Sequence, residues 1–354
     1  MVALDVPRLA GDRDAQARLT MLALSGALVL TALLSLSHGA SGVSLGSLVQ
    51  ALTSGEAMPA RDRLILWDIR LPRMLTGVLV GASLAVAGAV MQGLFRNPLA
   101  DPGLVGVGAG AGLGAVLAIV LGGLAPLWLT QAVGYHLVSV AAFLGGWAST
   151  LILYRVATRS GRTSVATMLL AGIALGALAG AVTGVLVYIA DDRQLRDLTF
   201  WGLGSLGGAS WPKLMAAGPV MLLALVAAPF LARGLNGLAL GEAAAHHIGL
   251  PVQRVKAVAI LTVAAATGAG VAIAGGIGFI GIVVPHLLRL ATGPDHRFLL
   301  INAGLAGATL LLLADLIARS IIAPAELPIG IVTATLGAPV FLWILLRRRG
   351  LVDL

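Results

Sequence analysis

The sequence of 354 residues has no cysteine, and only 11% of its residues are charged. The absence of cysteine excludes disulfide bonds, thiolate metal sites and thiol nucleophiles. The low charge excludes an ordinary soluble domain, in which about a quarter of the residues are charged. Apolar residues predominate instead, since 58% of the chain is hydrophobic and the mean hydropathy is +0.99. This composition predicts an all-α polytopic membrane protein.

Motifs for catalysis are also missing. The only lysines are Lys213 and Lys256, and neither lies in a GxxxxGK[ST] loop, so any ATP must be bound by another chain. The sequence has no HExxH or GxSxG motif and no cluster of carboxylates within an apolar segment, which argues against a metalloprotease and a proton-relay transporter. We expect the histidines at helix ends to be hydrogen-bonded interfacial residues. No enzyme activity, metal site or bound cofactor is therefore predicted for this chain.

Apolar segments recur along the sequence and predict ten transmembrane helices within residues 19–346. The first is preceded by basic residues and could be read as a cleaved signal peptide, but it is long for one and no clear cleavage site follows. Residues 1–18 and 347–354 are predicted to be cytoplasmic tails. The predicted segments are 19–36, 74–95, 103–125, 132–156, 164–190, 213–232, 252–274, 276–292, 298–318 and 328–346.

The distribution of basic residues sets the predicted orientation. A cytoplasmic N-terminus puts nearly twice as many lysines and arginines on the inner side as on the outer side, as the positive-inside rule requires. An even number of crossings then places the C-terminus in the cytoplasm as well. The formal net charge of +8 comes from arginines that lie beside apolar segments. It therefore indicates membrane topology and contact with lipid rather than binding of nucleic acid.

Small residues at four-residue spacing predict close helix packing, because they lie on one helical face where another backbone can approach. The turn after the second segment is expected to place Asp101 as N-cap and Pro102 as first residue of the next helix. In the fifth segment the same spacing has a second interpretation, which is a smooth wall beside a passage for a bulky solute. The three series are Gly77, Gly81, Ala85, Ala89 and Gly93; Gly106, Gly110, Gly114, Ala118 and Gly122; and Gly172, Gly176, Gly180 and Gly184.

The longest predicted cytoplasmic loop, residues 234–251, contains the sequence GLALGEAAAHHIGLP. Its apolar residues are too few for a crossing, and we expect a short helix on the membrane surface. This helix either fills a connection or docks a cytoplasmic partner. Glu242 lies near its start, where the helix dipole favours an anion.

Arg70, Arg73 and Arg319 stand at predicted outer helix ends, and Arg319 follows Asp315 by one helical turn. One interpretation is ordinary charge at the membrane edge. The other is that exposed guanidinium groups receive carboxylates of an acidic partner in bidentate geometry. Asp315 is also the only candidate for an acid that a proton-coupled carrier would need, although it lies near the outer end of its helix.

Three stretches resemble the FecCD-type permease subunits of ABC importers for iron-siderophores, haem and cobalamin. They are RLPRMLTGVLVGASLAVAGAVMQGLFRNPLADPGLVGV, GFIGIVVPHLLRLATGPDHR and ADLIARSIIAPAELPIGIVTATLGAPVF. The resemblance implies the type II ABC importer permease fold in a bacterial inner membrane. It further implies a homodimer around a central pathway, two cytoplasmic ATPase subunits that bind ATP and Mg, and a periplasmic substrate-binding protein.

The resemblance also implies roles for particular residues. Coupling to the ATPase is carried by Gly241, Glu242, Ala243, Ala244 and His246; docking of the binding protein by Arg70, Arg73 and Arg319; and the cytoplasmic gate by Asn97, Thr163 and Ser164. The coupling segment departs from the EAAxxxG pattern of ABC permeases because Gly249 comes one residue later.

The substrate is expected to be haem, because ADDRQLRDLTFWGLGSLGGASW and APAELP look most like the haem-importing branch. Ferric siderophore and cobalamin are the alternatives within the family. A passive channel and a secondary carrier are the alternatives from other classes.

Overall fold

The computed structural model describes residues 13–39, 46 and 59–348, and these residues are almost entirely helical. The α-helices are α1 (Asp14–Ser37), α3 (Ala60–Leu64), α4 (Leu71–Leu94), α5 (Val107–Leu121), α6 (Leu127–Val133), α7 (Leu137–Ala157), α8 (Val165–Ile189), α9 (Asp192–Leu203), α10 (Trp211–Ala227), α11 (Ala232–Ala239), α12 (Glu242–His247), α13 (Val252–Ala274), α14 (Ile280–Thr292), α15 (His296–Ser320) and α16 (Ile329–Arg348). They are joined by the π-helical segment η1 (Ile65–Arg70) and by the 3-10 turns η2 (Pro102–Val105), η3 (Gly122–Leu124), η4 (Gly134–His136) and η5 (Ala228–Leu231), and β1 (Thr158–Arg159) pairs with β2 (Arg162–Thr163) in an antiparallel hairpin. Residues 1–12 and 349–354 of the two predicted tails lie outside the described residues.

Each of the ten predicted segments contains a helix, which confirms the all-α polytopic architecture. Within the described residues, eight helical stretches are long and apolar enough to cross a membrane, and α14 and α16 supply two shorter apolar helices. Helix α14 has 13 residues and is about 20 Å long, less than the roughly 30 Å of a bilayer's hydrocarbon core.

The chain before α14 shows why that helix is short. The predicted segment begins at residue 276, but Gly275 and Phe279 have positive φ values of 73° and 68°, and the helix starts only at Ile280. The backbone at this break bonds to the end of α9, where Gly276 N–H donates to Trp201 O and Ser205 N–H donates to Ala274 O. Non-helical backbone inside a membrane protein requires such internal partners.

Helix α9 and the start of α5 also differ from the prediction. Residues 192–203 lie outside the ten predicted segments, yet a capping box begins a helix there: Asp191 Oδ1 accepts from Gln194 N–H and the Gln194 side chain accepts from Asp191 N–H. Asp101 is an N-cap as predicted, but it caps the 3-10 turn η2. Gly106, with φ 71°, separates that turn from α5, so it is not part of the helical series.

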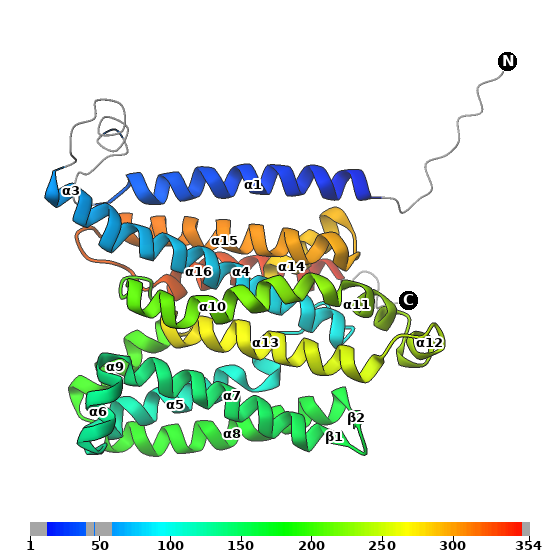
Figure 1. Cartoon of the computed structure of the whole chain (residues 1–354), viewed down its shortest axis with the longest axis horizontal. Helices are drawn as coiled ribbons and strands as arrows, with labels where there is room; N and C mark the ends of the chain where they lie inside the picture. Colours follow the sequence, from blue (N-terminus) through cyan, green and yellow to red (C-terminus); the bar gives the residue numbers. More distant parts are fainter. Residues whose placement is uncertain (1–12, 40–45, 47–58, 349–354) are drawn as a thin grey trace.

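Helix α4 is the centre of the bundle, with α1 and α15 on one side of it and α10, α13, α7 and α8 on the other (Figure 1). The predicted small-residue series on α4 faces α15, which confirms the packing prediction for this helix. A Cβ at Gly81 would collide with the backbone of Gly307, and a Cβ at Gly93 would collide with the His296 ring.

A second close contact of α4 lies outside the predicted series. A Cβ at Gly88 would overlap the backbone of Gly281 in α14. The short helix therefore presses directly on the backbone of α4, and this contact fixes it in place despite its length.

Helices α5 and α7 pack in the same way. A Cβ at Gly114 would fall on the carbonyl oxygen of Ala141, and one at Gly110 would meet the backbone of Gly145. In α8, by contrast, Gly176, Gly180 and Gly184 have no neighbour within 4 Å of an added Cβ. The close-packing interpretation of the α8 series therefore finds no partner in the described part of this chain.

We expect Gly114→Ala to destabilise the bundle by about 1–3 kcal/mol, because the new methyl group must push α5 away from the α7 backbone. The matched control is Gly112→Ala, two positions away on the same helix, where an added Cβ meets nothing within 4 Å. Thermal unfolding of the purified protein in detergent measures both variants. Equal midpoints for the two would contradict the packing role of Gly114.

Candidate functional site

The segment predicted to couple to a partner forms two short helices rather than one. α11 and α12 lie between α10 and α13 and are separated at Gly241, whose φ of 102° allows the sharp change of direction. Figure 1 shows α11, α12 and the β1–β2 hairpin at the same end of the molecule. This end is the predicted cytoplasmic one.

An open groove of about 590 Å³ lies along α12. Its lining combines charged and imidazole side chains with the start of α13, and it is contributed by Arg162, Glu242, Ala243, His246, His247, Pro251, Val252, Gln253 and Arg254. The predicted coupling residues Glu242, Ala243 and His246 thus lie on one accessible surface, with Ala244 partly buried behind them.

A buried lysine connects this groove to the predicted gate. Lys256 is 1% exposed, and its Nζ lies 2.6 Å from Glu242 Oε1 and donates to the carbonyl oxygen of Thr163 over 2.7 Å. Thr163 N–H in turn donates to Gln253 Oε1 over 2.9 Å. The Glu242 side chain is 44% exposed, so the chain of contacts runs from the open surface to the buried Thr163 of the hairpin.

Sequence reasoning missed the part that Lys256 plays. The residue was noted only as one of two lysines outside a phosphate-binding loop, although a charge near the start of an apolar helix is costly and marks a functional position. The cost of that charge was the signal available in the sequence. It did not identify the partners, because Thr163 is far from Lys256 in the sequence and Glu242 is separated from it by the turn between α12 and α13.

The other predicted gate residues have local roles in the structure. Ser164 is the N-cap of α8 and its Oγ accepts from Thr167 N–H, while Asn97 Oδ1 accepts from Leu99 N–H in the turn after α4. Neither contact reaches Lys256. The structure therefore brings Thr163 together with the coupling helix and places Asn97 after the end of α4 and Ser164 at the start of α8.

Helix α11 is tied to α15 by a second polar link. Asn236 Nδ2 donates to Asp295 Oδ1 over 2.8 Å, and Asp295 also accepts from the backbone and guanidinium of Arg297. Burial by itself raises the pKa of Asp295, but the hydrogen bonds from Arg297 and Asn236 outweigh it and lower the pKa to about 2. Asp295 is therefore a carboxylate across the physiological pH range, and the link persists there.

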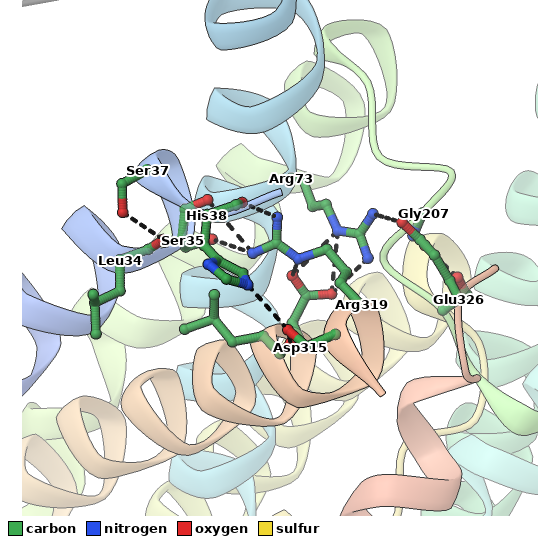
Figure 2. A network of polar contacts seen from close by, with 12 residues as sticks. Leu34, Ser35, Ser37, His38, Arg73, Gly207, Asp315, Arg319 and Glu326 are labelled. Atoms are coloured by element: carbon green, nitrogen blue, oxygen red, sulfur yellow. Dashed lines mark hydrogen bonds and ion pairs between the residues drawn. The ribbon is translucent and has the colours of Figure 1, made fainter. Parts of the chain in front are cut away.

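The predicted outer arginines form a cluster of ion pairs, shown in Figure 2. Asp315 is 1% exposed and lies between two guanidinium groups: Arg73 donates to it from Nε and Nη2, and Arg319 Nε lies 3.2 Å from its Oδ2. Arg73 Nη1 donates to Glu326 Oε1 over 2.6 Å. The predicted local pair of Asp315 and Arg319 is thus confirmed, and Arg73 and Glu326 extend it.

The other bonds of these arginines hold the end of α1. Arg319 Nη1 donates to His38 O, and Arg70 Nη1 donates to the carbonyls of Leu36 and Ser37. Carbonyls at a helix C-terminus lack intrahelical partners, so guanidinium groups are suited to them. The exposure that was expected of the arginines is not found, since Arg70 and Arg73 are 4% and 9% exposed. Docking of a binding protein at these residues stays a prediction.

We expect Asp315→Asn to lower the free energy of unfolding by about 3–5 kcal/mol, because it leaves two buried guanidinium groups facing a neutral amide. Glu326→Gln is the control, since the Glu326 side chain is 42% exposed and its loss costs at most about 1 kcal/mol. Thermal unfolding in detergent compares them. If both variants unfold at the wild-type temperature, the cluster does not stabilise the outer end.

Comparison with known proteins agrees with the sequence motifs. The model of the FecCD transport family matches residues 27–347. The hemin transport system permease protein HmuU of Yersinia pestis is 46% identical over 335 residues, which cover 94% of this chain and 97% of that protein. The vitamin B12 import system permease protein BtuC of Shigella boydii is 45% identical over 333 residues, covering 93% and 95%.

A solved structure has the same fold. It is described as an inward-facing conformation of a metal-chelate type ABC transporter, and it superposes with a TM-score of 0.79 at 33% identity, covering 92% of this chain and 98% of that one. A second, PsaBC from Streptococcus pneumoniae, matches with a TM-score of 0.53 at 16% identity and supports the fold alone. With the family model spanning nearly the whole chain, this protein belongs to the FecCD transport family and is a permease of an ABC importer.

Proposed function

We propose that two copies of this chain form the transmembrane pathway of an ATP-driven importer that carries haem from a periplasmic binding protein to the cytoplasm. The observation that carries the proposal is the continuous polar connection from the open groove at α12, through Glu242 and Lys256, to the β1–β2 hairpin at Thr163. A permease without a nucleotide site needs such a connection between the surface that meets its ATPase and the element that gates its pathway.

The groove suits a cytoplasmic ATPase as its occupant. Its exposed Glu242, His246 and Arg254 offer charges and hydrogen bonds to a polar protein surface, and α12 projects from the end of the bundle. When the ATPases close, a displacement of α12 is transmitted to Lys256, because a buried ammonium group follows its carboxylate rather than remain unpaired. Lys256 also holds the Thr163 carbonyl, so the hairpin that precedes α8 moves with it.

Helix α8 is suited to line the pathway and to meet a second copy of the chain. Most of its surface is exposed within one chain, and its glycines leave a smooth face without a packing partner. A large planar cargo needs weak, even contact while it crosses, and a glycine-rich apolar wall without ion pairs provides that. The homodimer predicted from the family resemblance would place this helix beside its counterpart.

Haem is the first choice of cargo because the hemin permease HmuU is 46% identical over nearly the whole chain. Cobalamin is the second candidate, since BtuC proteins match almost as well at 45%. Both compounds are metal complexes of a tetrapyrrole-type macrocycle, and a smooth apolar wall without ion pairs suits either. The binding protein that delivers the cargo selects between them in this proposal.

Transport into proteoliposomes tests the function as a whole. We expect vesicles that contain this permease and its ATPase, supplied with haem-loaded binding protein, to accumulate haem only when ATP is present on the ATPase side. Haem absorbance in the washed vesicles is the readout, with cyanocobalamin and its carrier as the parallel cargo. Accumulation without ATP would contradict the ATP-driven import. Accumulation of cobalamin but not haem would show that cobalamin is the cargo.

Lys256→Met tests the coupling path. The thioether keeps the apolar stem of the side chain but removes the bonds to Glu242 and Thr163, so we expect uptake to fall at least about tenfold at unchanged ATPase assembly. Lys213→Met is the matched control, because the second lysine lies at the start of α10, away from the groove. Wild-type uptake by the Lys256 variant would show that coupling takes another route.

A further inference from the structure

The guanidinium group of Arg73 is shared by two carboxylates that differ sharply in exposure. Asp315 takes the Nε and Nη2 donors and is 1% exposed, whereas Glu326 takes Nη1 over 2.6 Å and its side chain is 42% exposed. Asp315 is further held by Arg319. One carboxylate is therefore fixed within the bundle, and the other bonds to Nη1 from the solvent side.

Glu326 reaches Arg73 from a different part of the chain, the connection between α15 and α16. Residues 321–326 of this connection are all exposed, and it rejoins the bundle where Leu327 N–H donates to Ala318 O. The second carboxylate oxygen of Glu326 lies 2.9 Å from the position of a Cβ at Gly207, in the loop between α9 and α10. Figure 2 shows Glu326 on the far side of Arg73 from Asp315.

Glu326 covers the side of Arg73 that a docking protein would have to reach. With Glu326 in place Arg73 is 9% exposed, so little of its guanidinium is accessible to an incoming protein. Removal of Glu326 would uncover Nη1 and leave the bonds to Asp315 intact. The carboxylate that covers Nη1 is thus also the exposed one, and water can hydrate it when it leaves Arg73.

We propose that Glu326 is a placeholder that occupies Arg73 in the free permease and gives way to a carboxylate of the binding protein when that protein docks. The inference rests on the proposed function, because it requires that a periplasmic binding protein docks on this permease. The partner that fits is an acidic surface loop whose carboxylate can accept from Nη1 in the geometry that Glu326 now has.

The exchange has a physical consequence for docking. One carboxylate replaces another on the same donor, so the net gain from this contact is small, and Glu326 competes for Arg73 throughout the lifetime of the complex. Release of the emptied binding protein is then assisted by return of Glu326. Arg73 Nη1 is thus paired with a carboxylate both in the free permease and in the complex.

Binding measurements on the intact permease–ATPase complex in nanodiscs test the exchange. Because Glu326→Gln weakens the competitor and preserves its shape, we expect the Kd for the binding protein to fall about fivefold at low salt, chiefly through slower dissociation. Asp68→Asn is the matched control, since it removes one negative charge from the exposed surface of η1, and no contact of Asp68 with Arg73 is found among the described residues. Equal effects of the two variants would overturn the placeholder and leave only a change in overall charge.

A third variant separates failure of this inference from failure of the docking prediction. Arg73→Gln combined with Asp315→Asn replaces the buried pair by two amides, and Arg319 keeps its bonds to the carbonyls of His38 and Ser35. If this variant is folded by thermal unfolding and binds like wild type, the binding protein does not dock at Arg73 and both ideas fail. If it binds more weakly while Glu326→Gln behaves like Asp68→Asn, docking stands and the placeholder alone is wrong.

Discussion

Contact between the backbones of α4 and α15 at Gly81 and Gly307 is the constraint on which the rest of the structure depends. Neither residue has a side chain, so the two helices touch at that point and their register cannot slide without a collision. Helix packing in a membrane gains nothing from burying apolar surface, because lipid is equally apolar, and close van der Waals contact takes its place. The glycines on α4 provide that contact toward α15, and Gly88 provides it toward α14.

The register set by this contact places the polar groups at the outer end. The two helices are antiparallel, and Arg73 and Asp315 lie equally far along each helix from the Gly81–Gly307 contact, so the guanidinium and the carboxylate meet. At the inner end the same register puts Gly93 against His296, the first residue of α15. A central apolar contact therefore aligns two polar ends, one joined to the α15–α16 connection and the other to α11 through Asp295.

Much of this could be predicted from the sequence because each signal is local. Apolar length indicated every crossing, the α4 glycine series indicated its packed face, and the spacing of Asp315 and Arg319 indicated their pair. The predictions failed where local signals conflict with longer-range contacts. Segment 276–292 is apolar throughout, yet its first residues are unwound because they bond to the end of α9. The glycine series of α8 has the same spacing as that of α4 and packs on nothing within the described chain.

The sequence by itself determined that this protein spans a membrane, lacks a GxxxxGK[ST] loop and carries the motifs of the FecCD family, because composition, spacing and motif are properties of neighbouring residues. Only the tertiary structure decided which charges that are distant in the sequence meet. Arg73 is distant in sequence from Asp315 and Glu326, and Lys256 is distant from Thr163. The partners of a buried charge depend on the register between packed helices, and that register is set by contacts between backbones, which no local pattern of residues specifies.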